Sequence, residues 1–206
     1  MKIADPIRDG IRLVVRQEAR FVDWLFRGRV TANHITWLSL AMHIPIAVAI
    51  ILEYYDLGAL LIVLFGLMDA LDGELARLQN RTSDYGVFLD ASTDRIKESL
   101  VYLPLIFVFA DEMRPAAALV AALALAGSLS VSYIKARGET VLKESRLSAA
   151  EINRVFNIGF ARYEVRMAIM VIGFLLNEPF AAVSIVAVSA WLTAFYRLLA
   201  IGNKLR

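Results

Sequence analysis

Six long apolar segments dominate the chain and restrict the folds open to it. They lie at about residues 34–54, 57–78, 86–110, 115–136, 164–176 and 179–201. A bilayer core of roughly 30 Å takes about 20 helical residues to cross, so each segment could span a membrane, the fifth with help from its polar flank. Hydrophobic residues make up 59% of the 206 residues, above the roughly 45–50% of soluble domains. The sequence therefore predicts one all-α integral membrane domain over residues 1–206, with six transmembrane helices in a bundle.

A basic and apolar stretch at residues 6–28 precedes these segments. Arginines alternate with apolar residues at three- and four-residue spacing, as in Ile7, Arg8, Ile11 and Arg12. This pattern is typical of an amphipathic helix on an anionic membrane surface. We therefore expect a juxtamembrane interfacial helix before the first span.

The distribution of Lys and Arg predicts the orientation. If the N-terminus is cytoplasmic and all six segments span, the outer loops lie near 55–57, 111–114 and 177–178. Of the 22 Lys and Arg, only Arg114 falls in them. Because cytoplasmic loops carry the excess of Lys and Arg, we expect a multi-pass protein of the cell (inner) membrane with both termini in the cytoplasm.

Four aspartates lie where a membrane penalises charge, near the shared cytoplasmic ends of the second and third segments. Asp69 and Asp72 are three residues apart, and Asp90 and Asp94 are four apart, so each pair projects from one helix face. A tight turn near 81–84 would bring the two pairs face to face. Four unpaired carboxylates would cost on the order of 10 kcal/mol in a membrane.

Divalent cations between the carboxylates would offset that penalty. The chain has no cysteine, so a metal site must use oxygen or histidine ligands, and an all-oxygen set is what Mg²⁺, Mn²⁺ or Ca²⁺ prefers. The alternative is a buried ion network in which aspartates pair with nearby cations. The candidate partners are Arg77, Arg81, Arg95 and Lys97.

The acidic residues belong to a longer pattern of fixed spacing. It runs Asp69-x2-Asp72-Gly73-x2-Ala76-Arg77-x8-Gly86-x3-Asp90-x3-Asp94. This pattern resembles the signature of the CDP-alcohol phosphotransferase family. The resemblance implies that CMP is displaced from a CDP-linked lipid donor, usually CDP-diacylglycerol, by a hydroxyl of a small polar alcohol. It also implies two Mg²⁺ ions, with Mn²⁺ as a substitute, a site on the cytoplasmic side of the bilayer, a homodimer and no nucleic-acid partner.

The resemblance also assigns roles to individual residues. Asp69, Asp72 and Asp90 would bind the metal ions, and Asp94 would join the second ion and serve as the catalytic base. The residues expected to hold the CDP-lipid nucleotide are Asn33, Gly73, Ala76, Arg77 and Ser83. Asn33 follows Ala32, where the family usually has proline, and capping of the first helix is an alternative role for Asn33 that does not exclude the first.

Basic residues near later spans bear on the acceptor. Tyr133-x-Lys135-x-Arg137-x-Glu139 is followed by Arg162-x-Glu164-x-Arg166. These runs resemble the prokaryotic branch that makes phosphatidylinositol phosphate, or its archaeal ether-lipid counterpart, from inositol 1-phosphate. The expected contacts to the acceptor phosphate are Lys135, Arg137, Arg162 or Arg166, and Arg197. For any one of them, positive-inside topology alone is the alternative explanation.

The sequence is also compatible with other acceptors and with one other class of protein. Glycerol 3-phosphate presents the same phosphate, as in phosphatidylglycerophosphate synthases, and a CDP-inositol donor would make a di-inositol phosphate. A small transporter with an intramembrane acidic site is the non-enzymatic alternative. Transporters often show inverted repeats, and the sequence shows none.

Overall fold

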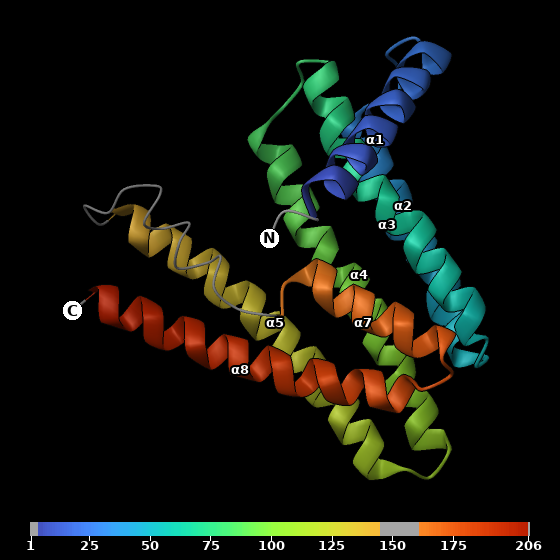
Figure 1. The fold of residues 1–206 in the computed structure, drawn as a ribbon, viewed down its shortest axis with the longest axis vertical. Coiled ribbons are helices and arrows are strands. Elements are labelled where there is room, and N and C mark those ends of the chain that lie inside the picture. Colours follow the sequence, from blue (N-terminus) through green and yellow to red (C-terminus); the bar gives the residue numbers. More distant parts are fainter. Residues whose placement is uncertain (1–3, 145–160, 206) are drawn as a thin grey trace. The chain divides into compact units, whose positions relative to one another are not determined.

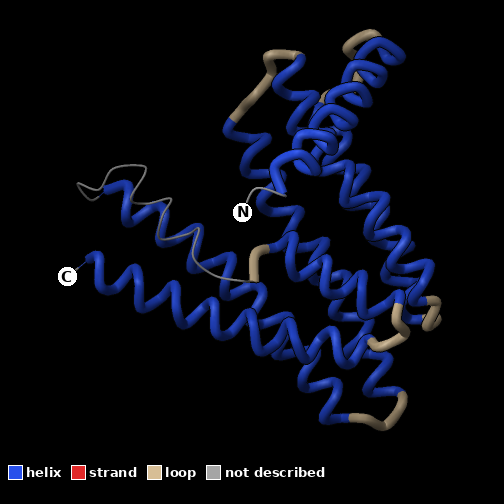
Figure 2. The backbone as a smooth tube through the Cα atoms, viewed as in Figure 1, coloured by secondary structure: helices blue, strands red, loops and turns tan. Residues whose placement is uncertain are grey.

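The computed structural model describes residues 4–144 and 161–205, and the regular elements in these residues are helices, without a strand (Figures 1 and 2). The helices are α1 (Ala4–Phe26), α2 (Ala32–Ile51), α3 (Tyr55–Leu78), α4 (Asp84–Asp111), α5 (Pro115–Glu144), α7 (Tyr163–Leu175) and α8 (Pro179–Leu205). The predicted all-α class is confirmed. Each of the six apolar segments coincides with one of the helices α2 to α8.

Three helices are long and apolar enough to cross a membrane, judged by length and composition. They are Ala32–Ile51, Pro115–Leu142 and Pro179–Leu205. α3 and α4 carry the aspartates and further charged residues, and α7 has only 13 residues. The helical content and the three apolar helices indicate a membrane protein, while the count of six spans stays a prediction.

α5 is longer than the sequence predicts. The fourth apolar segment ends near residue 136, and the polar residues 138–162 that follow it predict a cytoplasmic loop with a helix in it. Instead α5 continues to Glu144, because polar residues can extend a helix beyond its apolar part without a change in backbone geometry. The rest of that expected loop, residues 145–160, lies outside the described residues.

Two compact units divide the chain. The first comprises Met1–Ile46 and Leu60–Leu100, and the second comprises Ala47–Ala59 and Val101–Arg206. α2, α3 and α4 therefore each contribute residues to both units. All four aspartates belong to the first unit, and the basic residues expected at the acceptor belong to the second.

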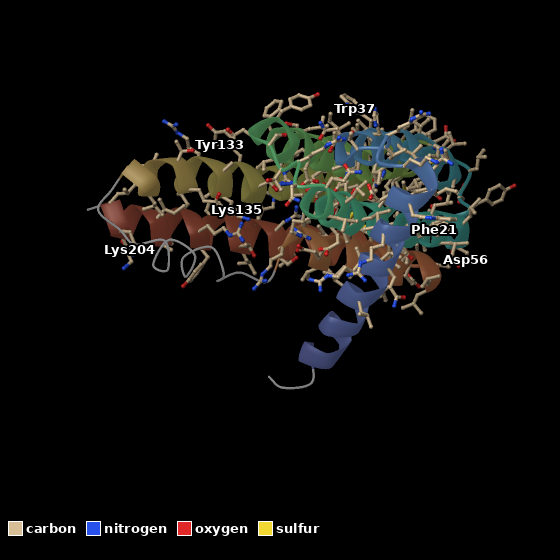
Figure 3. The ribbon with its side chains drawn as sticks, turned by 90° about the horizontal axis from the view of Figure 1, so that it is seen from above. Phe21, Trp37, Asp56, Tyr133, Lys135 and Lys204 are labelled. Carbon is tan, nitrogen blue, oxygen red and sulfur yellow. The ribbon has the colours of Figure 1, made fainter. Side chains whose placement is uncertain are left out.

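The core of the first unit forms where α1 packs on α2 and α3. Its buried residues are Ala19, Ile35 and Leu75, with Val22 and Met68 among the partly buried residues around them. The expected helix at 6–28 is present as α1. Several apolar side chains of α1, such as Phe21, are exposed, as is Trp37 of α2 (Figure 3). The position of α1 at a membrane surface remains a prediction.

A short connection joins α3 to α4 within the first unit. Asn80 has a positive φ of 53°, the left-handed conformation in which helices commonly end. Ser83 Oγ then accepts a 3.1 Å hydrogen bond from the backbone N–H of Gly86 and so caps the first turn of α4. This connection fixes where α4 starts and hence where Asp90 and Asp94 lie.

In the second unit, α8 packs against both α5 and α7. Small residues allow this close approach: Gly127 of α5 faces Ala190 and Trp191 of α8. Trp191 Nε1 donates a 3.1 Å hydrogen bond to the carbonyl oxygen of Leu123. Gly127 thus packs against α8 of the same chain.

Candidate active site

Lys97 joins two of the four aspartates. Its Nζ lies 2.6 Å from Asp69 Oδ1 and 3.2 Å from Asp94 Oδ1, and its side chain is fully buried. Asp69 comes from α3 and Asp94 from α4, so the contact shows that these two carboxylates lie close together. Arg95 Nη1 is 3.7 Å from the other oxygen of Asp94.

A polar row on α2 supports the carboxylates of α3. Thr36 Oγ1 donates a 2.7 Å hydrogen bond to Asp72 Oδ2, and Ser39 Oγ donates a 3.0 Å hydrogen bond to Asp69 Oδ1. His43 Nδ1 lies 2.8 Å from the carbonyl oxygen of Ser39. All three side chains are buried. Sequence reasoning missed these supporting roles, although three polar residues at three- and four-residue spacing in an apolar span were a visible signal.

The carboxylate oxygens of the four aspartates are suited to bind a divalent metal ion. Asp69 Oδ2 is buried and accepts no hydrogen bond from the described residues, so it is an available hard ligand of the kind Mg²⁺ and Mn²⁺ prefer. Within the described part of the chain, however, no three acidic or histidine side chains converge as a metal ion would require. The Lys97 ammonium lies between Asp69 and Asp94 instead. The residues fit the ion in ligand chemistry and burial, and their side chains would have to rotate to bind it.

The alternative of a buried ion network is present in part. Lys97 and Arg95 contact the aspartates as that alternative expected. Arg77 instead pairs with Glu74 (2.8 Å), and Arg81 donates to the carbonyl oxygen of Gly28 (3.3 Å). Two of the four candidate cations therefore have their main contacts elsewhere.

A pocket of about 190 Å³ opens beside Asp72 and Asp90. Its lining includes all five residues expected at the nucleotide, namely Asn33, Gly73, Ala76, Arg77 and Ser83. Sites for whole drug-sized ligands have volumes of roughly 300–1,000 Å³. The pocket can thus hold part of a large ligand while the remainder lies outside it.

The pocket is suited to an anion. The first turn of α2, with Asn33, and the first turn of α4, from Ser83 to Gly86, both line it. Helix N-termini present free backbone N–H groups and partial positive charge, which favour phosphate. Arg77 and Arg81 add two cations to the lining.

Two details refine the expected roles of Asn33 and Gly86. α2 begins at Ala32, so Asn33 lies inside the first turn, where its side chain lines the pocket, and is not the cap. A Cβ added to Gly86 would lie 3.4 Å from both Asn33 Oδ1 and Ser83 Oγ. The missing side chain at Gly86 keeps these two polar atoms accessible.

Glu74 orients Arg77, a contact that the sequence did not predict. Glu74 Oε2 accepts hydrogen bonds from Arg77 Nε at 3.1 Å and Nη2 at 2.8 Å, while Glu74 Oε1 accepts one from Arg16 Nε at 2.9 Å. Because Arg77 and Arg16 are largely exposed, these pairs add little to the stability of the fold. Their effect is to direct the Arg77 guanidinium.

The basic residues of the second unit divide into buried and exposed groups. Arg166 and Arg197 are buried; their Nη1 atoms donate to the carbonyl oxygens of Ala161 (2.6 Å) and Val131 (3.2 Å). Arg197 lies within electrostatic range of Arg162 and Arg166. Three of the five expected acceptor contacts, Arg162, Arg166 and Arg197, therefore interact electrostatically.

The other two expected acceptor contacts lie on α5. Lys135 is exposed (Figure 3) and lies 3.8 Å from Glu139. Arg137 is exposed as well. Glu139 is also within electrostatic range of Arg197. Clustered guanidinium groups of this kind favour a bound phosphate or carboxylate.

Comparisons with known proteins agree with the motif. The family model described as CDP-alcohol phosphatidyltransferase matches residues 29–197. The archaetidylinositol phosphate synthase of Aeropyrum pernix is 35% identical over 148 residues, which cover 71% of this chain and 70% of that protein. The phosphatidylinositol phosphate synthase of Corynebacterium glutamicum is 33% identical over 118 residues, or 56% of this chain and 54% of that protein.

Solved structures give the same result. The crystal structure of Mycobacterium tuberculosis phosphatidylinositol phosphate synthase with CDP-DAG bound has a TM-score of 0.77 and 26% identity, and the match covers 91% of this chain and 93% of that one. The same enzyme in complex with manganese and citrate has a TM-score of 0.78 and 25% identity, with 92% and 89% covered. The chain therefore belongs to the CDP-alcohol phosphatidyltransferase family.

Proposed function

We propose that the protein transfers a phosphatidyl-type group from a CDP-linked lipid to inositol 1-phosphate, releases CMP and forms phosphatidylinositol phosphate or its ether-lipid counterpart. The observation that carries the proposal is the pocket in which the five expected nucleotide contacts meet Asp72 and Asp90. The relatives named as archaetidylinositol and phosphatidylinositol phosphate synthases support the same substrates. Membership of a transferase family sets the transporter alternative aside.

The pocket would hold the CDP part of the donor. Its two helix N-termini, together with Arg77 and Arg81, would face the diphosphate, and Asn33 and Ser83 would contact the nucleoside. The pocket volume of about 190 Å³ leaves the acyl or ether chains outside, where they would lie in the bilayer. The same geometry suits CDP-diacylglycerol and its ether analogue.

The aspartates would perform the chemistry. Asp69, Asp72, Asp90 and Asp94 would hold two Mg²⁺ ions, or Mn²⁺ in their place, which when bound neutralise the diphosphate and align it with the attacking oxygen. Asp94 would accept the proton of the acceptor hydroxyl. The hydroxyl oxygen then forms a bond to the β-phosphorus of the donor, and the bond from that phosphorus to the oxygen of the leaving CMP breaks.

The basic residues of the second unit would bind the acceptor phosphate. Lys135, Arg137, Arg197 and either Arg162 or Arg166 supply enough positive charge for a phosphate dianion. Glycerol 3-phosphate carries the same phosphate and is the acceptor to test first against inositol 1-phosphate.

The membrane arrangement belongs to the same proposal. The six helices that coincide with the apolar segments would all span the inner membrane, α1 would lie on its cytoplasmic surface, and the site and both termini would face the cytoplasm. The single basic residue in the expected outer loops, Arg114, supports this orientation. A homodimer would be the functional assembly.

A panel of acceptors tests the proposal. Purified protein in detergent, with Mg²⁺ and CDP-diacylglycerol, is offered inositol 1-phosphate, glycerol 3-phosphate, serine, free inositol or no acceptor, and the release of CMP is measured. We expect release only with inositol 1-phosphate, and none from the Asp94→Asn variant. Release with glycerol 3-phosphate alone would identify glycerol 3-phosphate, and not inositol 1-phosphate, as the acceptor. Absence of release with every acceptor, using both the ester and the ether donor, would overturn the proposal.

A further inference from the structure

Lys97 is the one buried ammonium that directly contacts the aspartate cluster among the described residues. The Lys97 side chain has no exposed surface, and its Nζ contacts one oxygen each of Asp69 and Asp94 at 2.6 and 3.2 Å. A buried ammonium is stable only beside compensating negative charge, and removing one partner leaves an uncompensated buried charge. Lys97 and the two aspartates therefore form one mutually dependent group.

Lys97 contacts the same carboxylates that the proposed function assigns to the metal ions. Asp69 Oδ1 already accepts hydrogen bonds from Ser39 and Lys97, while Asp69 Oδ2 is buried without a hydrogen bond. A divalent ion bound by both Asp69 and Asp94 would lie next to the ammonium. Like charges at that distance repel strongly in a weakly polar interior. A metal ion that used Asp69 Oδ1 and Asp94 Oδ1 would therefore have to replace the ammonium at these two oxygens.

Displacement of Lys97 requires its buried side chain to rotate. Asp94 and Lys97 are three residues apart on one helix face, and the four-carbon stem of a lysine is flexible. Rotation of the Lys97 side chain would withdraw the ammonium without a movement of the backbone. The same rotation would release Asp69 Oδ1 and Asp94 Oδ1 together.

We propose that Lys97 is an internal cation that pairs with Asp69 and Asp94 in the metal-free protein and that a divalent ion must displace before the site is complete. The inference rests on the metal site of the proposed function. Lys97 is thus a positioning residue: it keeps the carboxylates close together in the membrane segment before metal binds, and it weakens metal binding by competition. The single positive charge of Lys97 offsets part of the cost of placing several carboxylates in a membrane before metal binds.

Removal of the ammonium should strengthen metal binding. When a site is competent for only a fraction of the time, its apparent Kd equals the intrinsic Kd divided by that fraction. If Lys97 occupies the carboxylates about 90% of the time, the Lys97→Gln variant should bind Mn²⁺ about tenfold more tightly than the wild type. A lysine that only supported the fold would give the opposite result, because its loss would loosen the site.

The experiment measures the Kd of Mn²⁺ for the whole protein in detergent by the decrease of the free-ion paramagnetic resonance signal. Wild type, Lys97→Gln and Arg114→Gln are compared. Arg114 is a matched control because it is also an ion-paired cation, but its partner is Glu112 at 2.9 Å. We expect tighter binding in Lys97→Gln and a Kd within about twofold of the wild type in Arg114→Gln.

The outcomes separate this inference from the proposed function. If the wild type binds Mn²⁺ and Lys97→Gln binds it no more tightly, the inference fails and the metal site stands. If neither the wild type nor Lys97→Gln binds Mn²⁺, both the inference and the proposed metal site fail. If Lys97→Gln does not fold, a second measurement uses wild-type protein labelled at the lysine side chains and follows the Cε resonance of Lys97. We expect addition of Mg²⁺ to shift this resonance. An unchanged resonance at saturating Mg²⁺ would refute displacement of Lys97.

Discussion

Thr36 and Asp72 are joined by a hydrogen bond between two buried side chains, with 2.7 Å between Thr36 Oγ1 and Asp72 Oδ2. The bond links α2 to α3 and fixes which oxygen of Asp72 is left to face the pocket that Asp72 lines. Residues that orient a metal ligand commonly influence affinity or activity by about 10- to 100-fold. Thr36 itself also lines that pocket and is therefore part of the site.

Thr36→Val removes the hydroxyl and keeps the shape of the side chain. We expect it to raise the Mn²⁺ Kd or lower the rate of CMP release by about 10- to 100-fold, because the Asp72 carboxylate loses its orienting donor. Thr36→Ser restores the hydroxyl and should stay close to the wild type. Equal behaviour of Thr36→Val and the wild type in both assays would show that the hydrogen bond has no functional role.

Asp94→Asn separates chemistry from donor binding. The amide cannot accept the acceptor proton, so CMP release should fall by about 10²- to 10⁴-fold, the usual contribution of a general base. Binding of the CDP-lipid should remain largely intact, since the nucleotide pocket is not lined by Asp94. Calorimetric titration of the variant with CDP-diacylglycerol measures the affinity for the donor directly.

Asp69→Asn is the comparison for that experiment, because Asp69 is expected to bind metal without acting as the base. Asp69→Asn should weaken donor binding as well as turnover. If Asp94→Asn lost donor affinity as severely as Asp69→Asn, the assignment of Asp94 as the base would be wrong.

The sequence predicted those parts of the molecule that depend on local pattern. Apolar periodicity located the helices, and the fixed spacing of Asp69, Asp72, Asp90 and Asp94 identified the family that the comparisons confirm. The end of α5 was missed, because the polar residues from 138 to Glu144 continue the helix without the apolar pattern that marks a span.

Contacts between distant residues could not be derived in the same way. Lys97 contacts Asp69, 28 residues away, and the choice of Lys97 over Arg77 as its partner depends on how α3 and α4 pack. The contacts of Thr36 and Ser39 with the aspartates could not be predicted for a related reason. A hydroxyl in an apolar helix can bond either to its own helix backbone or to a neighbouring helix. Only the position of the facing helix decides between the two.

Gly173 should be indispensable for the packing of α7 on α8. A Cβ at this position would overlap Ala182 and lie 3.2 Å from the carbonyl oxygen of Glu178. Overpacking of a tight contact usually destabilises a protein by roughly 1–3 kcal/mol, so Gly173→Ala should lower the thermal unfolding temperature in detergent.

Gly202→Ala in α8 is the matched control, because an added Cβ there meets no atom within 4 Å. Alanine is the better helix former by about 0.5–1 kcal/mol, so Gly202→Ala should leave the unfolding temperature unchanged or raise it slightly. If Gly173→Ala were as stable as Gly202→Ala, the close approach of α7 and α8 described here would be incorrect.

Lys135→Ala and Arg137→Ala test the acceptor site without disturbing a buried charge, since both side chains are exposed. Hydrogen bonds to charged groups contribute about 1.5–3 kcal/mol, so loss of either cation should raise the KM for inositol 1-phosphate by about tenfold or more. The maximal rate and the KM for the CDP-lipid should change little, because neither residue lines the nucleotide pocket.

Lys204→Ala removes another exposed cation, at the end of α8 (Figure 3), and controls for general loss of positive charge. A KM that rose equally in Lys204→Ala would point to diffuse attraction of the anion, and unchanged acceptor kinetics in Lys135→Ala and Arg137→Ala would place the acceptor phosphate elsewhere.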